Sequence, residues 1–511
     1  MNAHVPETPP PIHFTEHSIQ PILEISLLLQ PCFPKGLYCY FLGIFFLKKA
    51  FGDVQLQTLM SKNYIPQAFY YTLAVVGILG VLSVLNTERT VLGYSLKPVS
   101  IFSDILTDAA PKTAGPVFVD TLVPEFEPCP PGVVCFRNFT DEKYPLDKLL
   151  ARLLKAKEKR GKVRIAWYGD SFSDGDILVS DLRDTLQSLY GGNGVGFVPI
   201  TSEIAGFRRS VIHSFGGWNT SSILTNPSSG RLGINGFCYT PDSGNYVFYK
   251  GTDHFRHTAM FNTFRLFYTS DFNQKARVLI NKKDSRVMEL AASSVPAMVM
   301  VQADSIRQVS ARLNLGGVTC LGASLEDETG IYIDNFAIKG NSGLGLRSIP
   351  QRNLAAFDSL LNYDLIVLQF GLNVSNSPTT DFTSYTKGMT KLINKLKEAF
   401  PETPILLLSV SDRSQRHQGQ FVTMPVIPML IQAQEKIAFE NKLLFWNLFD
   451  AMGGENSMAG FANSTPALAN KDYTHLNFAG GRKIGLSFAR SFIYEVEKYQ
   501  KRRSQFAVLT K

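Results

Sequence analysis

Four short apolar runs recur along the chain after residue 160, each ending at or near a glycine or a polar residue. They occupy residues 163–168, 365–370, 405–410 and 443–448. Uninterrupted runs of this length are typical of strands that are buried on both faces of a parallel sheet. Apolar residues recur at helical spacing in other segments, near residues 385–399, 428–442 and 481–499. This alternation predicts an α/β fold in which helices cover both faces of a parallel sheet.

The chain between residues 203 and 335 has a different pattern. It is rich in Phe, Tyr, Val, Thr, Asn and Gly, and short alternating segments such as NYVFYK and ARVLINKK are separated by turn residues. Alternation with a period of two is typical of antiparallel strands with one buried face. We therefore expect an inserted antiparallel, sandwich-like β domain of about 130 residues that splits the α/β domain in two.

An apolar stretch without a charge, residues 68–85, precedes both patterns. Its eighteen residues are near the minimum length for a membrane span. Thr72 and Ser83 are too few to give the polar face that a buried core helix usually shows. We expect a signal anchor that stays attached, because no small-residue cleavage site and no lipobox cysteine follows it. The short charged segment that begins at Met60 also predicts that translation starts there.

These patterns divide the chain into seven predicted segments. They are an N-terminal extension of uncertain status (1–59), the signal anchor (60–86), a linker rich in Pro, Thr and Val (87–143), the first part of the α/β domain (144–202), the inserted β domain (203–335), the second part of the α/β domain (336–500) and a basic tail (501–511). The composition fits such a multidomain protein, since 45% of the 511 residues are hydrophobic and 18% are charged.

Charge and cysteine content narrow the range of partners. The formal net charge of +8 is spread along the chain, which favours an anionic polymer or surface, whereas no basic patch with interleaved aromatic residues indicates nucleic-acid binding. The six cysteines lack the spacing of a zinc site, so we expect no metal and no other cofactor. Cys129 and Cys135 flank a short Pro/Gly loop; they could close a disulfide in an oxidising compartment or remain two free thiols.

Three polar motifs follow predicted elements at places where chemistry is expected. Ser171 lies in a turn directly after the first buried strand, which is where open α/β sheets place their active sites. Near the last helix, Asp472 precedes His475 by three residues. Its carboxylate can therefore hold the ring tautomer that leaves Nε2 available as a base. Asn373 follows the second buried strand, and its side-chain amide can donate to an oxyanion.

Three aspartates, Asp170, Asp174 and Asp176, crowd the serine turn. The remaining ligands of a calcium loop are missing, so we interpret them as turn and cap residues rather than as a cation site. GGNGVG at residues 191–196 follows a helical pattern and lacks the Lys-Ser/Thr pair of a phosphate loop. It therefore predicts a helix stop and a turn.

The polar motifs resemble a known superfamily. GDSF at residues 169–172, GLN at 371–373 and DYTH at 472–475 are similar, in this order, to three sequence blocks of the SGNH (GDSL-type) hydrolases. The fourth block of that superfamily is a glycine after the second strand, and GNSG at residues 340–343 supplies a candidate. The resemblance implies a three-layer α/β/α fold of the flavodoxin-like type.

The resemblance also implies a role for each matching residue. Ser171 corresponds to the nucleophile, His475 to the base and Asp472 to the residue that orients the base. Gly340 and Asn373 correspond to the residues that complete an oxyanion hole with the backbone N–H of Ser171. The choice of Gly340 within GNSG follows from its position relative to the preceding strand.

The layout is most similar to that of peptidoglycan O-acetylesterases that carry a carbohydrate-binding-module-like β domain between the serine and glycine blocks. This resemblance implies a serine esterase that acts outside the cytoplasm on O-acetyl groups of a carbohydrate polymer such as peptidoglycan. The predicted signal anchor agrees with it, so we expect the protein in the periplasm or cell envelope, anchored to the cytoplasmic membrane. The alternatives are an O-acetyltransferase of exported polysaccharide, a lipase or thioesterase, and a non-catalytic carbohydrate-binding protein. No feature of the sequence points to an oligomeric state.

Overall fold

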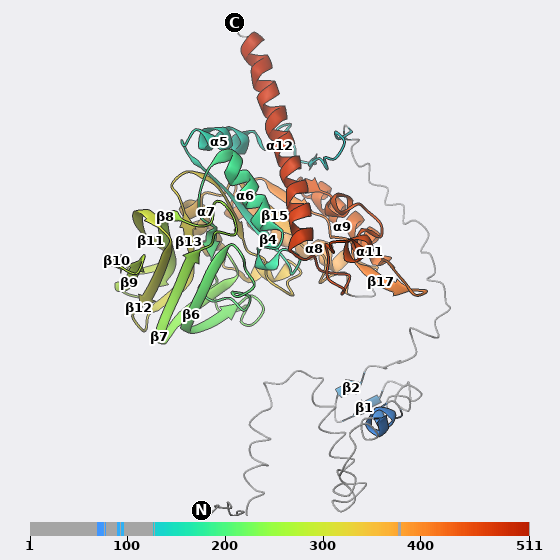
Figure 1. The fold of residues 1–511 in the computed structure, drawn as a ribbon, viewed down its shortest axis with the longest axis horizontal. Coiled ribbons are helices and arrows are strands. Elements are labelled where there is room, and N and C mark those ends of the chain that lie inside the picture. The colour runs from blue at the N-terminus through green and yellow to red at the C-terminus, as the bar shows by residue number, and fades with distance from the viewer. Residues whose placement is uncertain are drawn as a thin grey trace, which may run out of the picture. The chain divides into compact units, whose positions relative to one another are not determined.

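The computed structural model describes residues 69–75, 77, 89–91, 94–96, 126, 128–376 and 380–509. The chain divides into two compact units, Met1–Val119 and Asp120–Lys511. In the first unit, β1 (Arg89–Val91) and β2 (Tyr94–Leu96) pair as an antiparallel hairpin. The second unit holds the α/β sheet, the inserted β sheet and all of the predicted site residues (Figure 1).

Most of the predicted signal anchor, residues 60–86, lies outside the described residues. Within it, residues 69–75 and 77 are helical. Across the residues that the structure describes, no helix is both long enough and apolar enough to cross a membrane. The extension at 1–59 and the start at Met60 also lie outside the described residues. They and the anchor stay predictions.

The α/β part is built on a six-stranded sheet in the order β14-β4-β15-β16-β19-β3. Its strands are β3 (Arg137–Asn138), β4 (Lys162–Gly169), β14 (Gly330–Asn335), β15 (Leu365–Gln369), β16 (Ile405–Leu408) and β19 (Leu444–Trp446). β3 is antiparallel at the edge and its five companions are parallel, in the flavodoxin-like order 2-1-3-4-5. The four predicted apolar runs form β4, β15, β16 and β19, which are almost fully buried.

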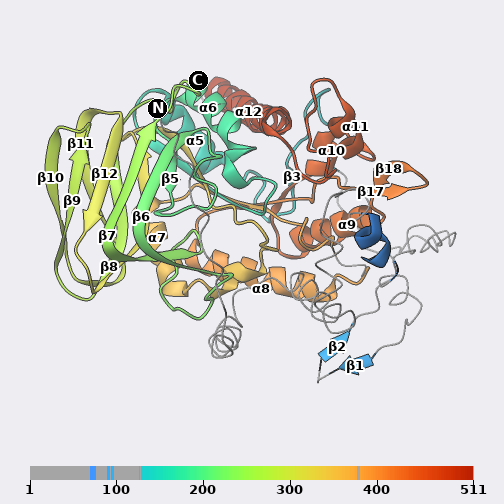
Figure 2. The ribbon, with the colours of Figure 1, turned by 60° about the horizontal axis from the view of Figure 1, so that its bottom comes forward.

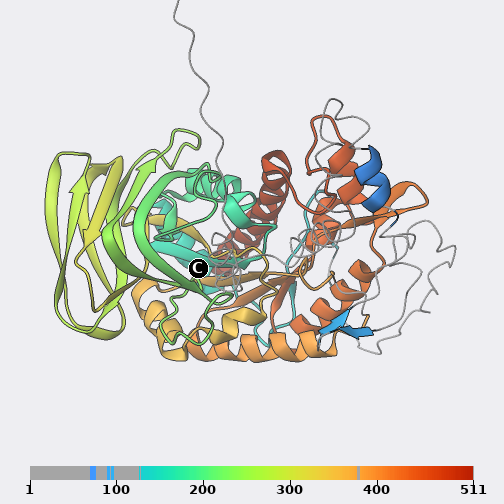
Figure 3. The ribbon, with the colours of Figure 1, turned by 90° about the horizontal axis from the view of Figure 1, so that it is seen from below.

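Helices cover both faces of this sheet (Figure 3). One layer contains α5 (Asp147–Lys157), α6 (Val179–Tyr190) and α12 (Phe478–Leu509), and the other contains α7 (Gln351–Leu361), α8 (Thr383–Ala399) and α9 (Val426–Glu440). Shorter helices are α10 (Leu448–Met452), α11 (Ser457–Asn463) and the 3₁₀ helices η2 (Asp174–Asp176) and η3 (Leu344–Ser348). The predicted three-layer α/β/α arrangement is therefore confirmed.

The start of α12 lies unusually close to the start of α6. A Cβ atom on Gly481 would lie 2.0 Å from the carbonyl oxygen of Ile177, and one on Gly485 would lie 2.6 Å from that of Leu178. Only glycine allows this approach of two backbones. The helix that follows the predicted histidine motif is thereby packed against the helix that follows the predicted serine motif.

The inserted domain is a nine-stranded antiparallel sheet that curves toward a barrel (Figure 2). Its strands are β5 (Gly196–Val198), β6 (Val211–Ser222), β7 (Phe237–Gly251), β8 (Phe261–Ser270), β9 (Gln274–Ile280), β10 (Asp284–Leu290), β11 (Ser293–Ile306), β12 (Gln308–Leu313) and β13 (Val318–Glu326). Alternate residues of β9 are buried, as the period of two predicts.

The boundaries of the insertion differ from the predicted 203–335 at both ends. β5 already pairs with β13 of the inserted sheet, and β14 has returned to the parallel sheet beside β4. The inserted sheet therefore spans residues 196–326. Asp334 interrupts the apolar pattern of β14, and its burial depends on partners that are distant in the sequence.

A buried cluster of charges joins the insertion to the parallel sheet. Arg164 of β4 is 1% exposed, and its guanidinium lies 2.7 Å from Asp334 of β14 and also contacts Glu326 of β13. Lys162 and Arg265 each lie 2.7 Å from Glu326. Burial alone would raise the pKa of Glu326, but the three cations outweigh it and hold that pKa far below its usual value. The cluster ties the last strand of the insertion to the sheet edge beside it.

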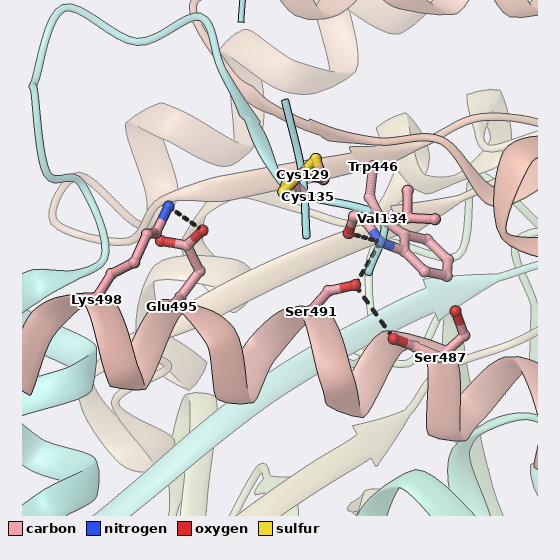
Figure 4. The surroundings of a disulfide bond; sticks show 8 residues. All are labelled: Cys129, Val134, Cys135, Trp446, Ser487, Ser491, Glu495 and Lys498. Atoms are coloured by element: carbon pink, nitrogen blue, oxygen red, sulfur yellow. Dashed lines mark hydrogen bonds and ion pairs between the residues drawn. A yellow bond between two sulfur atoms is a disulfide. The ribbon is translucent and has the colours of Figure 1, made fainter. Parts of the chain in front are cut away.

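The segment before α5 is held at the opposite edge of the sheet. β3 pairs with β19, and Cys129 and Cys135 form a disulfide shortly before β3 (Figure 4). Of the two alternatives for these cysteines, the structure has the bridged one. The indole Nε1 of Trp446 donates to the carbonyl oxygen of Val134 at 2.9 Å. The predicted linker at 87–143 therefore ends before this segment, which belongs to the folded unit.

Replacing Arg164 by methionine would leave the carboxylates of Glu326 and Asp334 buried with fewer cations. We expect the free energy of unfolding to fall by about 3–5 kcal/mol, the range for removing one partner of a buried ion pair. Urea unfolding followed by circular dichroism measures the loss. Lys275→Met, which removes an exposed cation 3.0 Å from Glu289, is the control and should change stability little. An equal loss in both variants would contradict the role given to the buried cluster.

Candidate active site

Ser171 lies in the turn that follows β4, at the carboxyl end of a parallel strand. The residue before it, Asp170, is fully buried, and its Oδ1 accepts from the N–H of Phe172 at 3.0 Å and from Nε2 of Gln369 at 3.1 Å. Its Oδ2 accepts from the N–H of Leu372 at 3.2 Å. Burial raises the pKa of Asp170, and these hydrogen bonds oppose that rise. Asp170 thus holds the serine turn against the loop that follows β15.

Gly169 ends β4 at a place where no larger residue fits. A Cβ atom there would lie 2.1 Å from Oγ of Ser173 and 2.8 Å from Oε1 of Gln369. The hydroxyl of Ser173 itself donates to Oε1 of Gln369 at 2.7 Å. The absence of a side chain at Gly169 lets the chain turn immediately after the strand. Ser171 lies in this turn and is half-buried.

The structure brings Ser171, His475 and Asp472 together in one line of hydrogen bonds. Oγ of Ser171 lies 2.9 Å from Nε2 of His475, and Nδ1 of the same ring lies 2.7 Å from Oδ2 of Asp472. The other carboxylate oxygen of Asp472 accepts from the backbone N–H groups of Thr474 and His475, both at 3.0 Å. If Nδ1 donates to Asp472, then Nε2 is an acceptor that faces the serine hydroxyl.

The surroundings of Asp472 favour its ionised form. Partial burial works to raise the pKa of Asp472, but hydrogen bonds from the backbone and ring of His475 and from the N–H of Thr474 outweigh it, so the pKa is lowered. An ionised carboxylate can stabilise the charge that the imidazole gains when it accepts a proton. The side chains of His475 and Asp472 are 34% and 48% exposed, so the line of hydrogen bonds is open to solvent.

Asn373 and Gly340 lie on neighbouring loops. Nδ2 of Asn373 donates to the carbonyl oxygen of Asn341 at 3.0 Å. The N–H of Ile338 donates to the last carbonyl of β4 at 3.0 Å, which keeps the segment leading to Gly340 alongside the serine turn. Among the described residues, the backbone N–H groups of Gly340 and Ser171 donate to no acceptor. Both can therefore serve an oxyanion.

Gly343, the other glycine of GNSG, is used differently. Its N–H donates to Oδ1 of Asn341 at 2.9 Å. A Cβ atom at this position would lie 2.9 Å from the ring of Phe370. Gly343 therefore closes the local turn, whereas the N–H of Gly340 has no such partner.

Asp176 contacts residues of several other elements, which its interpretation as a turn or cap residue did not predict. Its carboxylate is 1% exposed and lies 3.1 Å from Arg183 and 2.9 Å from Arg208. It also accepts from Ser210 at 2.5 Å and from Asn335 at 3.0 Å. Burial opposes ionisation, but the two arginines hold the pKa of Asp176 far below its usual value. The one local signal is the spacing to Arg183, two helical turns later.

Within the part of the chain that the structure describes, no three His, Cys, Asp or Glu side chains are grouped as ligands for a metal ion. The polar groups of the site are a hydroxyl, an imidazole, a carboxylate, an amide and backbone N–H groups. Such a set is suited to acyl transfer through a serine nucleophile.

We expect Asp170→Asn to lower kcat on a simple ester by about tenfold or more. The NH₂ group of the asparagine would face an N–H donor that the carboxylate now accepts from, and the loss of that hydrogen bond would loosen the serine turn. Asp304→Asn, at an exposed position of β11, is the matched control. Steady-state kinetics with p-nitrophenyl acetate measures the effect, and a thermal melt checks that the variant is folded. Wild-type kcat in a folded Asp170→Asn variant would contradict this role.

No family model matches the chain, and no curated protein does. Among solved structures, a peptidoglycan O-acetylesterase matches with a TM-score of 0.59 and 19% identity, over 71% of this chain and 99% of that chain. A family two carbohydrate esterase from Cellvibrio japonicus has a TM-score of 0.24 and 9% identity, over 56% and 99%. The salicylyl-acyltransferase SsfX3 has a TM-score of 0.26 and 15% identity, over 58% and 96%.

The match to the peptidoglycan O-acetylesterase extends beyond the α/β parts of the chain. A share of 71% of the chain exceeds what the α/β parts alone contain, so the inserted sheet belongs to the likeness. The chain therefore shares its fold, a three-layer α/β/α unit split by an inserted antiparallel β domain, with a solved peptidoglycan O-acetylesterase.

Proposed function

We propose that this chain is a serine esterase that removes O-acetyl groups from a carbohydrate polymer of the cell envelope, such as peptidoglycan. The observation that carries the proposal is the continuous line of hydrogen bonds from Oγ of Ser171 through His475 to Asp472. A serine hydroxyl is a weak nucleophile alone and needs an oriented base. His475 can be that base, and Asp472 orients it.

The proposed reaction has two steps. Oγ of Ser171 attacks the acetyl carbonyl carbon while Nε2 of His475 takes the hydroxyl proton. The N–H groups of Ser171 and Gly340 and the amide of Asn373 donate to the negative oxygen of the tetrahedral intermediate. When the bond to the sugar oxygen breaks, His475 returns the proton to that oxygen and the acetyl group stays on Ser171. A water molecule that gives a proton to His475 then attacks the carbonyl carbon of the acetyl-serine. The bond from that carbon to Oγ of Ser171 breaks, His475 returns the proton to Oγ, and acetate leaves.

Two features support a carbohydrate ester as the substrate. The fold is shared with a solved peptidoglycan O-acetylesterase over 99% of the length of that chain. The side chains of His475 and Asp472 are 34% and 48% exposed, which suits a polymer that must reach the site from outside. Hydrolysis of an acetyl ester needs no cofactor in this scheme.

We also propose that the reaction takes place in the periplasm or cell envelope. The predicted anchor at residues 60–86 would tether the folded unit to the cytoplasmic membrane. The bridge between Cys129 and Cys135 fits an oxidising compartment, because thiols in the cytoplasm are kept reduced.

Ser171→Ala should lower kcat for acetate release by about 10⁴-fold or more, since the nucleophile is lost while the fold is kept. The full-length protein in detergent is assayed with p-nitrophenyl acetate and with O-acetylated peptidoglycan. Equal acetate release by the variant and the wild type would reject the proposed function. Acetyl transfer to a second sugar in excess of acetate release would favour the acetyltransferase instead.

Asp472→Asn tests the orienting carboxylate separately. The amide cannot stabilise the imidazolium, so we expect kcat to fall by about 10²- to 10⁴-fold. KM on p-nitrophenyl acetate should change much less, because Asp472 contacts the base rather than the substrate. A rise in KM with an unchanged kcat would contradict the role given to Asp472.

A further inference from the structure

A two-stranded hairpin projects from the α/β part and contacts the histidine motif. β17 (Ser414–His417) and β18 (Gln420–Thr423) pair antiparallel and extend away from the body (Figure 2). The N–H of Ser414 donates to the carbonyl oxygen of Tyr473 at 3.0 Å. Tyr473 lies between Asp472 and His475 in the sequence, so the hairpin borders the proposed active site.

The hairpin stacks an aromatic ring on this motif. The ring centroids of Phe421 and Tyr473 are 3.6 Å apart, and the ring planes differ by 7°. Tyr473 is buried, and its hydroxyl donates to Oδ1 of Asn463 at 3.1 Å. Phe421 is 36% exposed. Because Tyr473 covers one face of the Phe421 ring, the exposed area of Phe421 is a flat apolar surface beside the site.

A cation shares this face of the hairpin. Arg416 lies directly opposite Phe421 in the register of the two strands, and His417 lies opposite Gln420. Side chains of a strand alternate between its faces, so Arg416 and Phe421 share one face and His417 and Gln420 the other. Arg416 is exposed and forms no ion pair with any carboxylate that the structure describes.

The base of the hairpin contacts the loop that carries Asn373. Nη1 of Arg413 donates to the carbonyl oxygen of Leu372 and to Oγ of Ser375, both at 3.3 Å. The hydroxyl of Ser414, on the same face as Arg416 and Phe421, is buried and has no partner among the described residues. Buried polar groups usually have a hydrogen-bond partner, so the hydroxyl of Ser414 is an unused donor and acceptor at the base of that face.

We propose that the face formed by Arg416 and Phe421 is a subsite for a carboxylate-bearing sugar of the polymer, a proposal that rests on the esterase function proposed above. The C–H face of a sugar ring packs on the open face of Phe421 and loses contact with water. The guanidinium of Arg416 binds the carboxylate through a bidentate pair. The net charge of +8 agrees with an acidic polymer as the substrate.

The test compares an acidic polymer, a neutral polymer and a sugar-free ester. The probes are O-acetylated polygalacturonate, O-acetylated dextran and p-nitrophenyl acetate, each assayed with the full-length protein. For Phe421→Ala, kcat/KM on either polymer relative to p-nitrophenyl acetate should fall about tenfold, and Phe421→Trp should restore it. Gln420→Ala, on the opposite face of the hairpin, is the matched control and should leave all three rates at the wild-type level.

Arg416→Gln tests the charge. We expect kcat/KM relative to p-nitrophenyl acetate to fall about five- to tenfold on polygalacturonate and to stay at the wild-type value on dextran. Added salt should weaken wild-type turnover of polygalacturonate and affect the variant less, because the ionic contact is screened.

Three outcomes would overturn the proposal. If Phe421→Ala lowers the polymer and p-nitrophenyl acetate rates in the same proportion, the ring only supports Tyr473 and no subsite exists. If Arg416→Gln affects acidic and neutral polymers alike, or neither, recognition of a carboxylate is rejected. Absence of any wild-type turnover of p-nitrophenyl acetate instead rejects the esterase function, and the subsite falls with it.

Discussion

The buried carboxylate of Asp170 holds together the two loops that carry the proposed nucleophile, Ser171, and the proposed oxyanion donor Asn373. Parallel strands bring the ends of β4 and β15 to the same edge of the sheet, but they leave the loops beyond them free to separate. Asp170 accepts from Phe172 on its own turn and from Gln369 and Leu372 on the other side. Ser171 lies between Asp170 and Phe172, and Asn373 directly follows Leu372, so this carboxylate helps to fix the position of one relative to the other.

The inserted domain is part of this arrangement rather than a loosely attached module. Arg164 joins β4 to the last strand of the insertion, and Asp176 joins the serine turn to Arg208, just before the first long strand of the insertion. Phe207 of the same segment packs on Phe478 with ring centroids 4.8 Å apart. Phe478 lies three residues after His475 in the sequence. Tyr473 lies two residues before His475 and stacks on Phe421 of the hairpin. Aromatic contacts from two separate elements therefore bracket the proposed base.

The sequence predicts those features that depend on neighbouring residues. The apolar runs give four of the parallel strands, and the spacing of Asp472 and His475 gives their contact, because each signal lies within one short segment. Contacts between residues that are distant in the sequence cannot be predicted in this way. Asp334 is buried within the apolar pattern of β14, and its partners Arg164, Phe197 and Tyr363 are all distant in the sequence. Asp176 and Arg208, or Phe421 and Tyr473, become partners only in three dimensions.

In the proposed reaction, Ser171 carries the acyl group between the two steps. The full-length protein is mixed with p-nitrophenyl acetate, quenched in acid within the first turnover, digested and analysed by mass spectrometry. We expect one acetyl group on the peptide that contains Ser171, and none on the same peptide of Ser171→Ala. Acetate release by the wild type with no acetylated Ser171, or with acetylation at another residue that persists in Ser171→Ala, would contradict it.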